Sequence, residues 1–228
     1  MSRAPVHVGV VMDGNRRWAR AAGLTNVSHG HRAGAQHVED LLAWCVEAGI
    51  EHVTTYVLSA DNIRKRPAHE VGFLFDLLAG ELPSLVERSE QWSLHVSGDL
   101  EMLPPDVRGA LTGAVRTTAG RARHLTMAIA YDGRADIVGA IRAAMRDGAD
   151  ASDPEAITAH LGGGPVKEID LVIRTSGEHR LSGFFPWQTA HAEVYVCSKP
   201  WPAFGRDDFL EALRHYSDRA DPERHAAS

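Results

Sequence analysis

The feature that most constrains the fold is the alternation of short apolar, β-branched runs with longer amphipathic segments. Six runs have the composition of buried strands: His7–Met12, His52–Ser59, Ser93–Gly98, Leu125–Ala130, Asp170–Arg174 and Glu193–Cys197. Apolar residues recur with helical spacing in six other segments: Ala33–Ala48, Ala68–Arg88, Asp106–Thr118, Arg134–Arg146, Pro154–Leu161 and Asp207–Arg219. This order predicts an α/β fold with a central, mostly parallel six-stranded sheet flanked by helices.

The length of 228 residues fits a single domain spanning 1–228. The glycine-rich stretch Gly162–Pro165 is too short to link two domains. The sequence has no apolar stretch that could span a bilayer and no visible signal peptide, so we expect a cytoplasmic protein; peripheral membrane contact is possible but not indicated. Cys45 and Cys197 lie in apolar segments, which is typical of reduced core cysteines.

Charge is distributed in a way that indicates a small anionic ligand. The formal net charge of -6 argues against nucleic acid as a partner. The cationic side chains nevertheless gather in three short stretches: Arg16, Arg17 and Arg20; Arg64, Lys65 and Arg66; Arg174 and Arg180. Because the planar fork of arginine donates two parallel hydrogen bonds to phosphate oxygens, these groups predict a phosphate-bearing ligand.

The first strand is followed by "DGNRRWAR", an arrangement that suits anion binding. Gly14 and Asn15 are turn residues, and Arg16–Ala22 has helical composition. Asp13 has two interpretations: it caps this helix, or its carboxylate holds Mg²⁺ beside a phosphate. A nucleophilic role of the phosphatase kind usually needs a second Asp two residues on, where this chain has Asn15.

Two further strand ends carry polar groups. "YVLSADNIRKRP" places Ser59, Asp61 and Asn62 after the second strand, which alone would indicate an ordinary turn and a helix cap. "DLVIRTSGEHRLSGFFPWQTAHAEVYV" supplies two arginines and a hydroxyl after another strand, a set suited to gripping a diphosphate. Glu193 opens the last strand, and we expect it to join Asp13 on a metal ion.

Taken together, the motifs resemble those of the cis-prenyltransferases. This Z-type isoprenyl diphosphate synthase family includes undecaprenyl diphosphate synthase and the short-chain Z-farnesyl diphosphate synthases. The stretches that carry the resemblance occur in the family's order from His7 to about Tyr216: "HVGVVMDGNRRWAR", "GHRAG", "DNIRKRP", "YDGRADIV", "DLVIRTSGEHRLSGFFPWQ" and "WPAF". The resemblance implies Mg²⁺ as cofactor, a homodimer, and an apolar tunnel for the growing chain.

The resemblance also implies roles for individual residues. Asp13 matches an essential aspartate that acts with Mg²⁺, Asn62 matches a proposed proton acceptor, and Glu193 matches a second metal-side carboxylate. The allylic diphosphate would be bound by Gly14, Asn15, Arg16, Arg17, Trp18 and His31. The loop after the second strand would contribute Ser59, Ala60, Asp61 and Ile63, with either Lys65 or Arg66 as its cation. Isopentenyl diphosphate would be bound by Arg174, Arg180, Leu181 and Ser182.

The implied reaction condenses isopentenyl diphosphate with an allylic diphosphate to give a Z-prenyl diphosphate and pyrophosphate. Val57 resembles the bulkier residue that farnesyl-length members carry at this position, and its β-branched side chain is stiff, so the resemblance implies a short product. We expect Phe73, Phe75 and Leu78 to help close the tunnel. A branched, lavandulyl-type condensation or a cyclisation is an alternative, supported by Pro186 and the changed "DNIRKRP" loop. A long-chain synthase or a non-catalytic partner subunit is less favoured, the latter because Asp13 is present.

Overall fold

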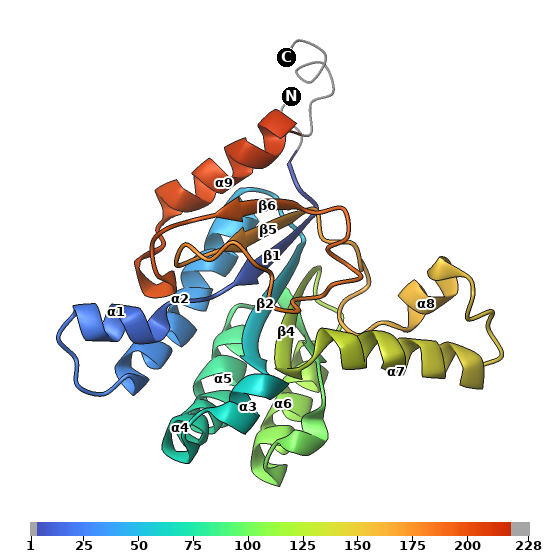
Figure 1. Ribbon diagram of the computed structural model, residues 1–228, viewed down its shortest axis with the longest axis horizontal. Helices are drawn as coiled ribbons and strands as arrows, with labels where there is room; N and C mark the ends of the chain where they lie inside the picture. Colours follow the sequence, from blue (N-terminus) through green and yellow to red (C-terminus); the bar gives the residue numbers. More distant parts are fainter. Residues whose placement is uncertain (1–3, 220–228) are drawn as a thin grey trace.

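The computed structural model describes residues 4–219, which form a single α/β domain (Figure 1). Six strands form one sheet in the order β3-β4-β2-β1-β5-β6, and every neighbouring pair is parallel. The strands are β1 His7–Val11, β2 His52–Ser59, β3 Trp92–Ser97, β4 Arg123–Tyr131, β5 Leu171–Arg174 and β6 Glu193–Val196. The predicted fold class is confirmed, and the chain ends at 1–3 and 220–228 lie outside the described residues.

Helices connect the strands as the apolar periodicity predicts, with two differences. The helices are α1 Asn15–Ala21, α2 Ser28–Glu47, α3 Ala60–Lys65, α4 Ala68–Ala79, α5 Glu81–Arg88, α6 Pro105–Thr118, α7 Gly133–Arg146, α8 Pro154–His160 and α9 Arg206–Arg219. The single helix predicted over Ala68–Arg88 is broken at Gly80, whose backbone angles (φ −125°, ψ −74°) are not helical. The short α3 was not predicted. No helix among residues 4–219 has the length and apolar character to cross a membrane.

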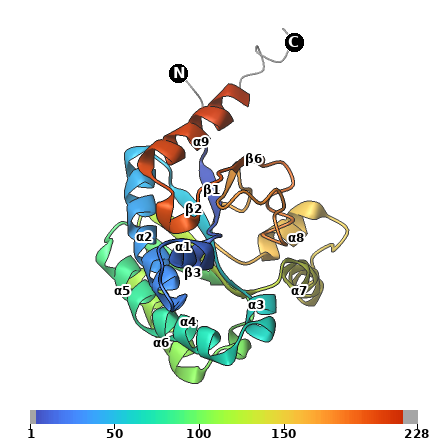
Figure 2. The ribbon, with the colours of Figure 1, turned by 60° about the vertical axis from the view of Figure 1, so that its left-hand side comes forward.

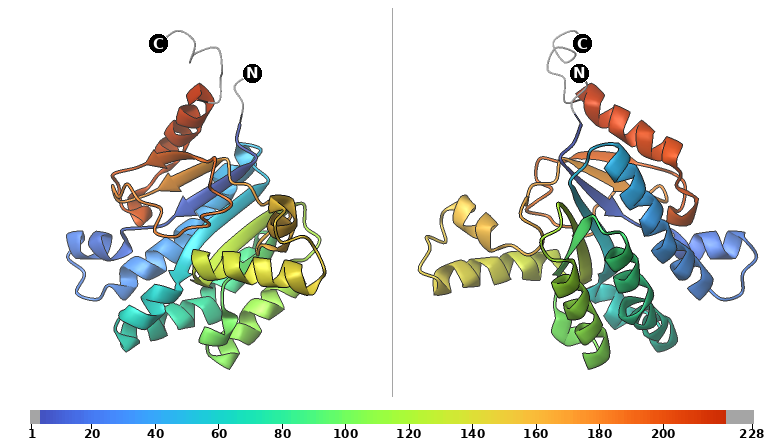
Figure 3. Two further views of the ribbon diagram at one scale, coloured as in Figure 1. Left: turned by 45° about the vertical axis from the view of Figure 1, so that its right-hand side comes forward. Right: turned by 180° about the vertical axis from the view of Figure 1, so that it is seen from behind.

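The two faces of the sheet are covered differently. The larger core lies against one face and is built from residues of α2, α4, α5, α6 and α9, which Figure 2 shows along one side of the sheet. Val8 and Val10 of β1 are fully buried there, and each such burial contributes about 1.5–3 kcal/mol. The other face packs against Phe184 and Phe185 of the loop 175–192. The helices α7 and α8 project away from the sheet (Figures 1 and 3).

Four histidines from neighbouring strands form a row across the sheet: His95, His124, His52 and His7. His95 Nε2 lies 3.0 Å from His124 Nδ1, and the rings of His124 and His52 stack with their centroids 5.0 Å apart. Burial and the neighbouring His52 lower the pKa of His7 to about 4, and burial also lowers the pKa of His52 and His95. His7, His52 and His95 are therefore packed in their neutral forms.

This row predicts that the protein loses stability on acidification at a higher pH than the one at which the carboxylates titrate. Unfolded histidine titrates near pH 6.5, so between about pH 4 and 6.5 the native state binds fewer protons than the unfolded state. The free energy of unfolding should therefore fall as the pH drops below 6.5, by up to about 1.4 kcal/mol per pH unit for each histidine. Urea unfolding at pH 7, 6 and 5 measures this slope.

The matched variants are His52→Gln in the row and His69→Gln at an exposed position. The first should reduce the slope and the second should leave it unchanged. A wild-type unfolding free energy that is constant from pH 7 to 5 would contradict the prediction.

Candidate active site

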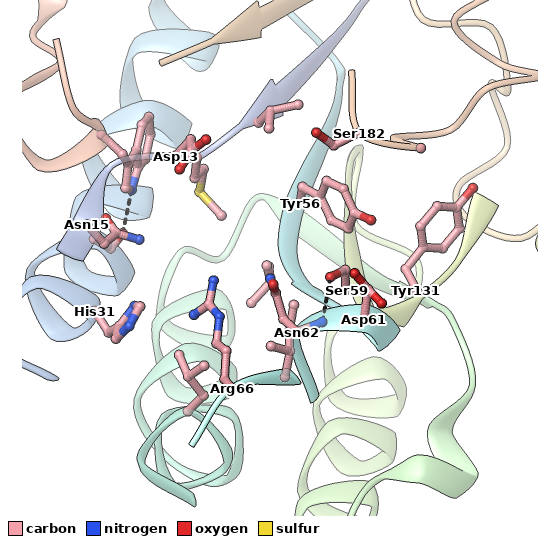
Figure 4. A pocket seen from close by; sticks show the side chains of 18 of the residues that line it. Asp13, Asn15, His31, Tyr56, Ser59, Asp61, Asn62, Arg66, Tyr131 and Ser182 are labelled. Atoms are coloured by element: carbon pink, nitrogen blue, oxygen red, sulfur yellow. Dashed lines mark hydrogen bonds between the residues drawn. The ribbon is translucent and has the colours of Figure 1, made fainter. Parts of the chain in front are cut away.

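A cavity of about 800 Å³ opens at the carboxyl ends of β1, β2, β4 and β5 (Figure 4). Parallel sheets bind ligands at this edge, because the loops that follow the strands meet there. Polar side chains from three of the predicted strand ends line it, and a group of leucines from α4 and α5 lines it as well. The cavity therefore joins a polar region to an apolar one.

Asp13 is held where β1 ends. Its backbone oxygen accepts hydrogen bonds from the Trp201 amide (2.8 Å) and from Thr175 Oγ1 (2.7 Å). One carboxylate oxygen accepts from the Gly14 amide at 2.7 Å and the other from Arg174 Nη2 at 3.0 Å. The side chain remains 38% exposed toward the cavity. The helix-cap interpretation is wrong, because Gly14 occupies the N-cap position of α1 and no side chain caps that helix.

Two glycines allow α1 to start so close to Asp13. Gly14 has φ 102°, and a Cβ there would lie 2.6 Å from Ser176 Oγ and 2.8 Å from Pro200 Cα. A Cβ at Gly30 of α2 would lie only 2.1 Å from the carbonyl oxygen of Asn15. Glycine at these positions lets the backbone of α1 pack directly on α2 and on the loop after β5.

A second, smaller cavity of about 300 Å³ adjoins the first and is lined by four arginines: Arg16, Arg17, Arg20 and Arg66. Both cavities share Asp13, Asn15, His31 and Arg66 in their walls. The side-chain oxygen of Asn15 is buried without a hydrogen-bond partner among the described residues. Such an unpaired polar atom costs about 1–3 kcal/mol, which a bound ligand or water would recover.

Glu70 organises the cationic wall between the two cavities, and the sequence motifs did not single it out. Its side chain is 2% exposed, and Oε1 lies 2.9 Å from His31 Nε2, 3.1 Å from Arg66 Nη1 and 3.7 Å from Arg16 Nε. Burial alone would raise the pKa of Glu70, but the His31 hydrogen bond and the two arginines outweigh it and lower the pKa. The available signal was a glutamate in the first turn of α4, only four residues after Arg66, the C-cap residue of α3.

Arg174 links the ends of β1 and β5. Its side chain is 3% exposed, and besides Asp13 it donates to Ser182 Oγ at 3.0 Å and to the carbonyl oxygen of Arg180. Its Nε is buried without a partner among the described residues. Arg180 lines the same cavity with a side chain that is 67% exposed. A buried, fixed arginine and a largely exposed one that pairs with Glu178 thus stand at this end of the cavity.

The end of β2 is shaped by Ser59, which caps α3 by accepting a hydrogen bond from the Asn62 amide at 3.0 Å (Figure 4). Asn62 and Asp61 line the cavity. The two candidate cations point different ways. Lys65 forms a 2.7 Å ion pair with Asp61 and is 74% exposed, whereas Arg66 lines both cavities and pairs with buried Glu70. The structure therefore favours Arg66 as the cation of this loop.

The apolar end of the large cavity differs in part from expectation. Val57 and Leu78 line it as predicted, but Phe73 and Phe75 do not. Phe73 instead lies under the Arg32 guanidinium, 5.3 Å from ring centroid to Cζ. Positions three and four apart on α4 face the cavity, so Leu74 and Leu77 line this end with Leu78. Leu82, beyond the break at Gly80, also lines it, as do Ala35 and Val38 of α2.

Two tyrosines at the sheet edge were also not predicted. Tyr56 and Tyr131 line the large cavity, with ring centroids 6.0 Å apart in an edge-to-face arrangement. Tyr131 donates to Asp136 Oδ2 at 3.0 Å, and burial, together with Asp136, raises its pKa. Tyr131 therefore keeps its hydroxyl proton at neutral pH. Tyr131 opens the motif "YDGRADIV" and Tyr56 opens "YVLSADNIRKRP", but the spacing of these motifs alone gave the tyrosines no role.

The structure gathers most of the predicted site residues around the two cavities. The predicted residues that line one or both are Asp13, Gly14, Asn15, Arg16, Arg17, His31, Ser59, Asp61, Asn62, Arg66, Arg174, Arg180 and Ser182. Five other predicted binding residues line neither: Trp18, Ala60, Ile63, Lys65 and Leu181. Ala60, for example, is the first residue of α3, and its side chain is buried.

The expectation that Glu193 joins Asp13 on one metal ion is not met within this chain. Glu193 is the first residue of β6 and pairs with Leu171 at the start of β5, whereas Asp13 follows the last residue of β1. The start and the end of parallel strands lie at opposite edges of the sheet. Glu193 instead lies 3.5 Å from Arg219. Among residues 4–219, no group of three or more His, Cys, Asp or Glu side chains is arranged to hold a metal ion.

Comparisons with known proteins agree with this geometry. A family model described as putative undecaprenyl diphosphate synthase matches residues 11–223. The chain therefore belongs to this family of prenyltransferases, the cis-isoprenyl diphosphate synthases.

Named relatives share much of the sequence. The chain is 44% identical to a short-chain Z-isoprenyl diphosphate synthase of Mycobacterium leprae, over 96% of this chain and 87% of the relative. It is 42% identical, with the same coverage, to a (2Z,6E)-farnesyl diphosphate synthase of Mycobacterium tuberculosis. A solved lavandulyl diphosphate synthase from Lavandula x intermedia, in complex with dimethylallyl diphosphate, superposes with a TM-score of 0.87 at 32% identity, covering 94% of this chain and 95% of that one.

The positions of Arg66 and Lys65 predict a contrast between two neighbouring cations. Arg66→Ala removes a guanidinium from the wall shared by both cavities and leaves buried Glu70 with one partner fewer. A lost charge-assisted bond costs about 1.5–3 kcal/mol, so affinity for a diphosphate ligand should fall at least tenfold. Lys65→Ala should change it less than twofold, because that ammonium faces solvent. Isothermal titration with inorganic pyrophosphate measures both, and equal losses would contradict the assignment of Arg66.

Proposed function

We propose that the chain condenses isopentenyl diphosphate with an allylic diphosphate to form a short, farnesyl-length Z-prenyl diphosphate and pyrophosphate. The observation that carries the proposal is the pair of adjoining cavities. One is walled by four arginines, the other has Arg174 and Arg180 at its rim and leucines behind them, and the two share a wall. The two cationic regions suit two diphosphate groups, and the apolar region suits one hydrocarbon chain.

Each diphosphate is assigned to one cationic group. The allylic diphosphate occupies the smaller cavity, where Arg16, Arg17 and Arg66 surround it. Isopentenyl diphosphate occupies the end of the large cavity near Arg174, Arg180 and Ser182. Guanidinium groups bind phosphate oxygens in pairs, which fixes orientation as well as charge. The shared wall then brings the two reacting carbons together.

The protein groups act on charge, water and one proton. Pyrophosphate leaves the allylic carbon, and Arg16, Arg17 and Arg66 stabilise the negative charge that it gains. The double bond of isopentenyl diphosphate attacks the allylic carbon, and Asn62, which lines the cavity near Ser59, is the proposed acceptor of the departing proton. The leucines of α4 and α5 keep water away from the cationic intermediate.

The residues present fit Mg²⁺ bound together with a diphosphate. Asp13 offers the exposed side of one carboxylate in the wall of both cavities, and Mg²⁺ is commonly held by one or two carboxylates with phosphate oxygens and water. When bound there, the ion would neutralise charge on the departing pyrophosphate. Asp13 would hold it, while Arg174 keeps the carboxylate in place.

A farnesyl-length product is supported by the size and lining of the large cavity. Its volume of about 800 Å³ lies within the range of about 300–1,000 Å³ found for sites that bind one small ligand. Val57 and Leu78 stand in its wall, and we propose that the apolar end forms the tunnel for the chain. The two mycobacterial relatives are named for short or farnesyl-length products.

The lavandulyl-type alternative has two observations in its favour. Pro186 lines the large cavity, and the plant enzyme that superposes on this chain is a lavandulyl diphosphate synthase. That enzyme is 32% identical to this chain, whereas the mycobacterial relatives are 42–44% identical. We therefore retain the ordinary condensation, and the products formed from dimethylallyl diphosphate alone would distinguish the two.

A homodimer in the cytoplasm completes the proposal. Helix α7 projects from the sheet (Figure 3). Its side chains Val138 and Met145 are 45% and 66% exposed, and we propose that a second copy covers them. A metal role for Glu193 also requires a second copy, since in one chain it lies at the opposite edge from Asp13.

Association through α7 predicts twice the chain mass of 24.8 kDa in sedimentation. Met145→Glu should weaken association, because it places a charge in an apolar contact. A wild-type chain that sediments as a monomer at micromolar concentration would contradict the proposed dimer.

The proposed reaction predicts dependence on both Asp13 and Mg²⁺. Incubation with Mg²⁺, isopentenyl diphosphate and each allylic diphosphate should yield a Z-prenyl diphosphate, and EDTA should abolish it. Asp13→Ala should lower kcat by at least about a hundredfold, the usual effect of losing one charge-stabilising group. Chromatography of the dephosphorylated products measures both. Turnover of the variant within tenfold of wild type, with EDTA harmless, would refute the metal role.

Product length should respond to the residues that line the cavity and not to their neighbours. Val57→Ala combined with Leu78→Ala opens the apolar end, and burying one further five-carbon unit could contribute up to about 4 kcal/mol. The double variant should therefore make longer products. Phe73→Ala is the matched control on α4, since Phe73 does not line the cavity. Unchanged product length in the double variant, or equal lengthening in the control, would contradict the assignment.

A further inference from the structure

The contact between His31 and Glu70 has a consequence for how an anion binds. His31 comes from α2 and Glu70 from α4, and their side chains are 5% and 2% exposed. His31 Nε2 lies 2.9 Å from Glu70 Oε1. His31 lines both cavities, whereas Glu70 lies behind it and lines neither. Glu70 therefore acts on a ligand only through the groups that it holds.

This contact fixes which side of the imidazole faces the cavities. The pKa of Glu70 is lowered, so its carboxylate is ionised and can only accept a hydrogen bond. Nε2 of His31 therefore carries the hydrogen. Nδ1 has no hydrogen-bond partner among residues 4–219. It is also not one of the side-chain polar atoms of that part of the chain that are both buried and unpaired. Nδ1 is thus open to the space that His31 lines.

A neutral His31 held in this way is poorly matched to a diphosphate. With the hydrogen on Nε2, Nδ1 offers a lone pair, and a diphosphate also presents lone pairs. A second proton on the ring converts Nδ1 into a donor and adds a positive charge. The same proton strengthens the contact with Glu70 by making it an ion pair between buried groups.

The charges around His31 keep the ring neutral until an anion arrives. The groups that face it are Glu70 on α4, Arg66 between α3 and α4, and Arg16 on α1; Asp13, Arg17 and Arg20 share the small cavity. Burial and the two arginines lower the pKa of His31, against the opposing effect of Glu70. A bound diphosphate would offset the repulsion from the arginines and favour the protonated ring.

We propose that His31 takes up a proton when a diphosphate binds, and that Glu70 is the positioning residue that holds the ring for this change. The proposal rests on the proposed function, because it needs a diphosphate in the arginine-walled cavity. The imidazolium then donates Nδ1–H to the ligand and is already charged before pyrophosphate departs. Proton uptake at binding thus prepares the site for the charge that develops during reaction.

The test is isothermal titration with inorganic pyrophosphate in buffers of different ionisation enthalpy, which counts the protons exchanged on binding. Wild type is compared with His31→Gln, Glu70→Gln and the exposed neighbour His69→Gln. Changes in the protonation of pyrophosphate itself are common to all four and cancel in the comparison. Wild type and His69→Gln should take up more protons than His31→Gln, and Glu70→Gln should take up fewer than wild type.

The affinity for pyrophosphate should depend on pH in the way that proton uptake by His31 requires. As the pH falls between 8 and 6, the ratio of wild-type to His31→Gln affinity should rise, by up to about tenfold per pH unit. In the intact wild-type chain, the NMR titration of the His31 Cε1–H signal should give a higher pKa with pyrophosphate than without it. This measurement needs no variant and covers the case in which Glu70→Gln does not fold.

Three outcomes would overturn the proposal in different ways. Equal proton counts and equal pH slopes in wild type and His31→Gln, with both binding pyrophosphate, would refute proton uptake and leave the diphosphate site standing. Wild-type uptake retained in a folded Glu70→Gln would refute the positioning role of Glu70. Failure of every form, wild type included, to bind pyrophosphate would refute the proposed function and this inference with it.

Discussion

Two carboxylates, Asp13 and Glu70, hold the cationic side chains of this site against their mutual repulsion. Two like charges about 4 Å apart repel by about 4 kcal/mol at the effective dielectric of a protein surface. Glu70 contacts Arg66, Arg16 and His31, and Asp13 contacts Arg174. The arginines still outnumber these acids in the cavity walls, so the arrangement is best balanced when an anion is present. The excess of arginines in the cavity walls therefore favours binding of a negatively charged ligand.

Much of this fold could be predicted from the sequence because its strands are short and apolar, and β1 and β5 are buried along their whole length. All six strands were found to within about two residues, since β-branched runs between helical segments have few other interpretations. The polar residues after β1, β2 and β5 could then be placed together, because parallel strands bring their carboxyl ends to one edge. The same rule, applied to Glu193, would have shown that the first residue of a strand lies at the other edge.

Other features depended on helix phase and backbone angles, which composition does not reveal. Lys65 and Arg66 are adjacent and chemically similar, and only the direction in which α3 ends sends one to solvent and the other into the cavities. Phe73 and Phe75 belong to the same apolar stretch as Leu74 and Leu77 but do not line the cavity. The break at Gly80 was hidden because apolar residues recur with helical spacing on both sides of it.

The histidines of this chain show how one side-chain type serves two purposes in one fold. Burial lowers the pKa of His31 and of the His7–His52–His95 group alike, so each is neutral in the free protein. The two sites differ in the groups that surround an added proton. At His31 it would strengthen the contact with Glu70 and face a cavity open to anions. In the row it would meet other imidazoles and Lys167, so protonation there opposes the fold, whereas at His31 it favours a ligand.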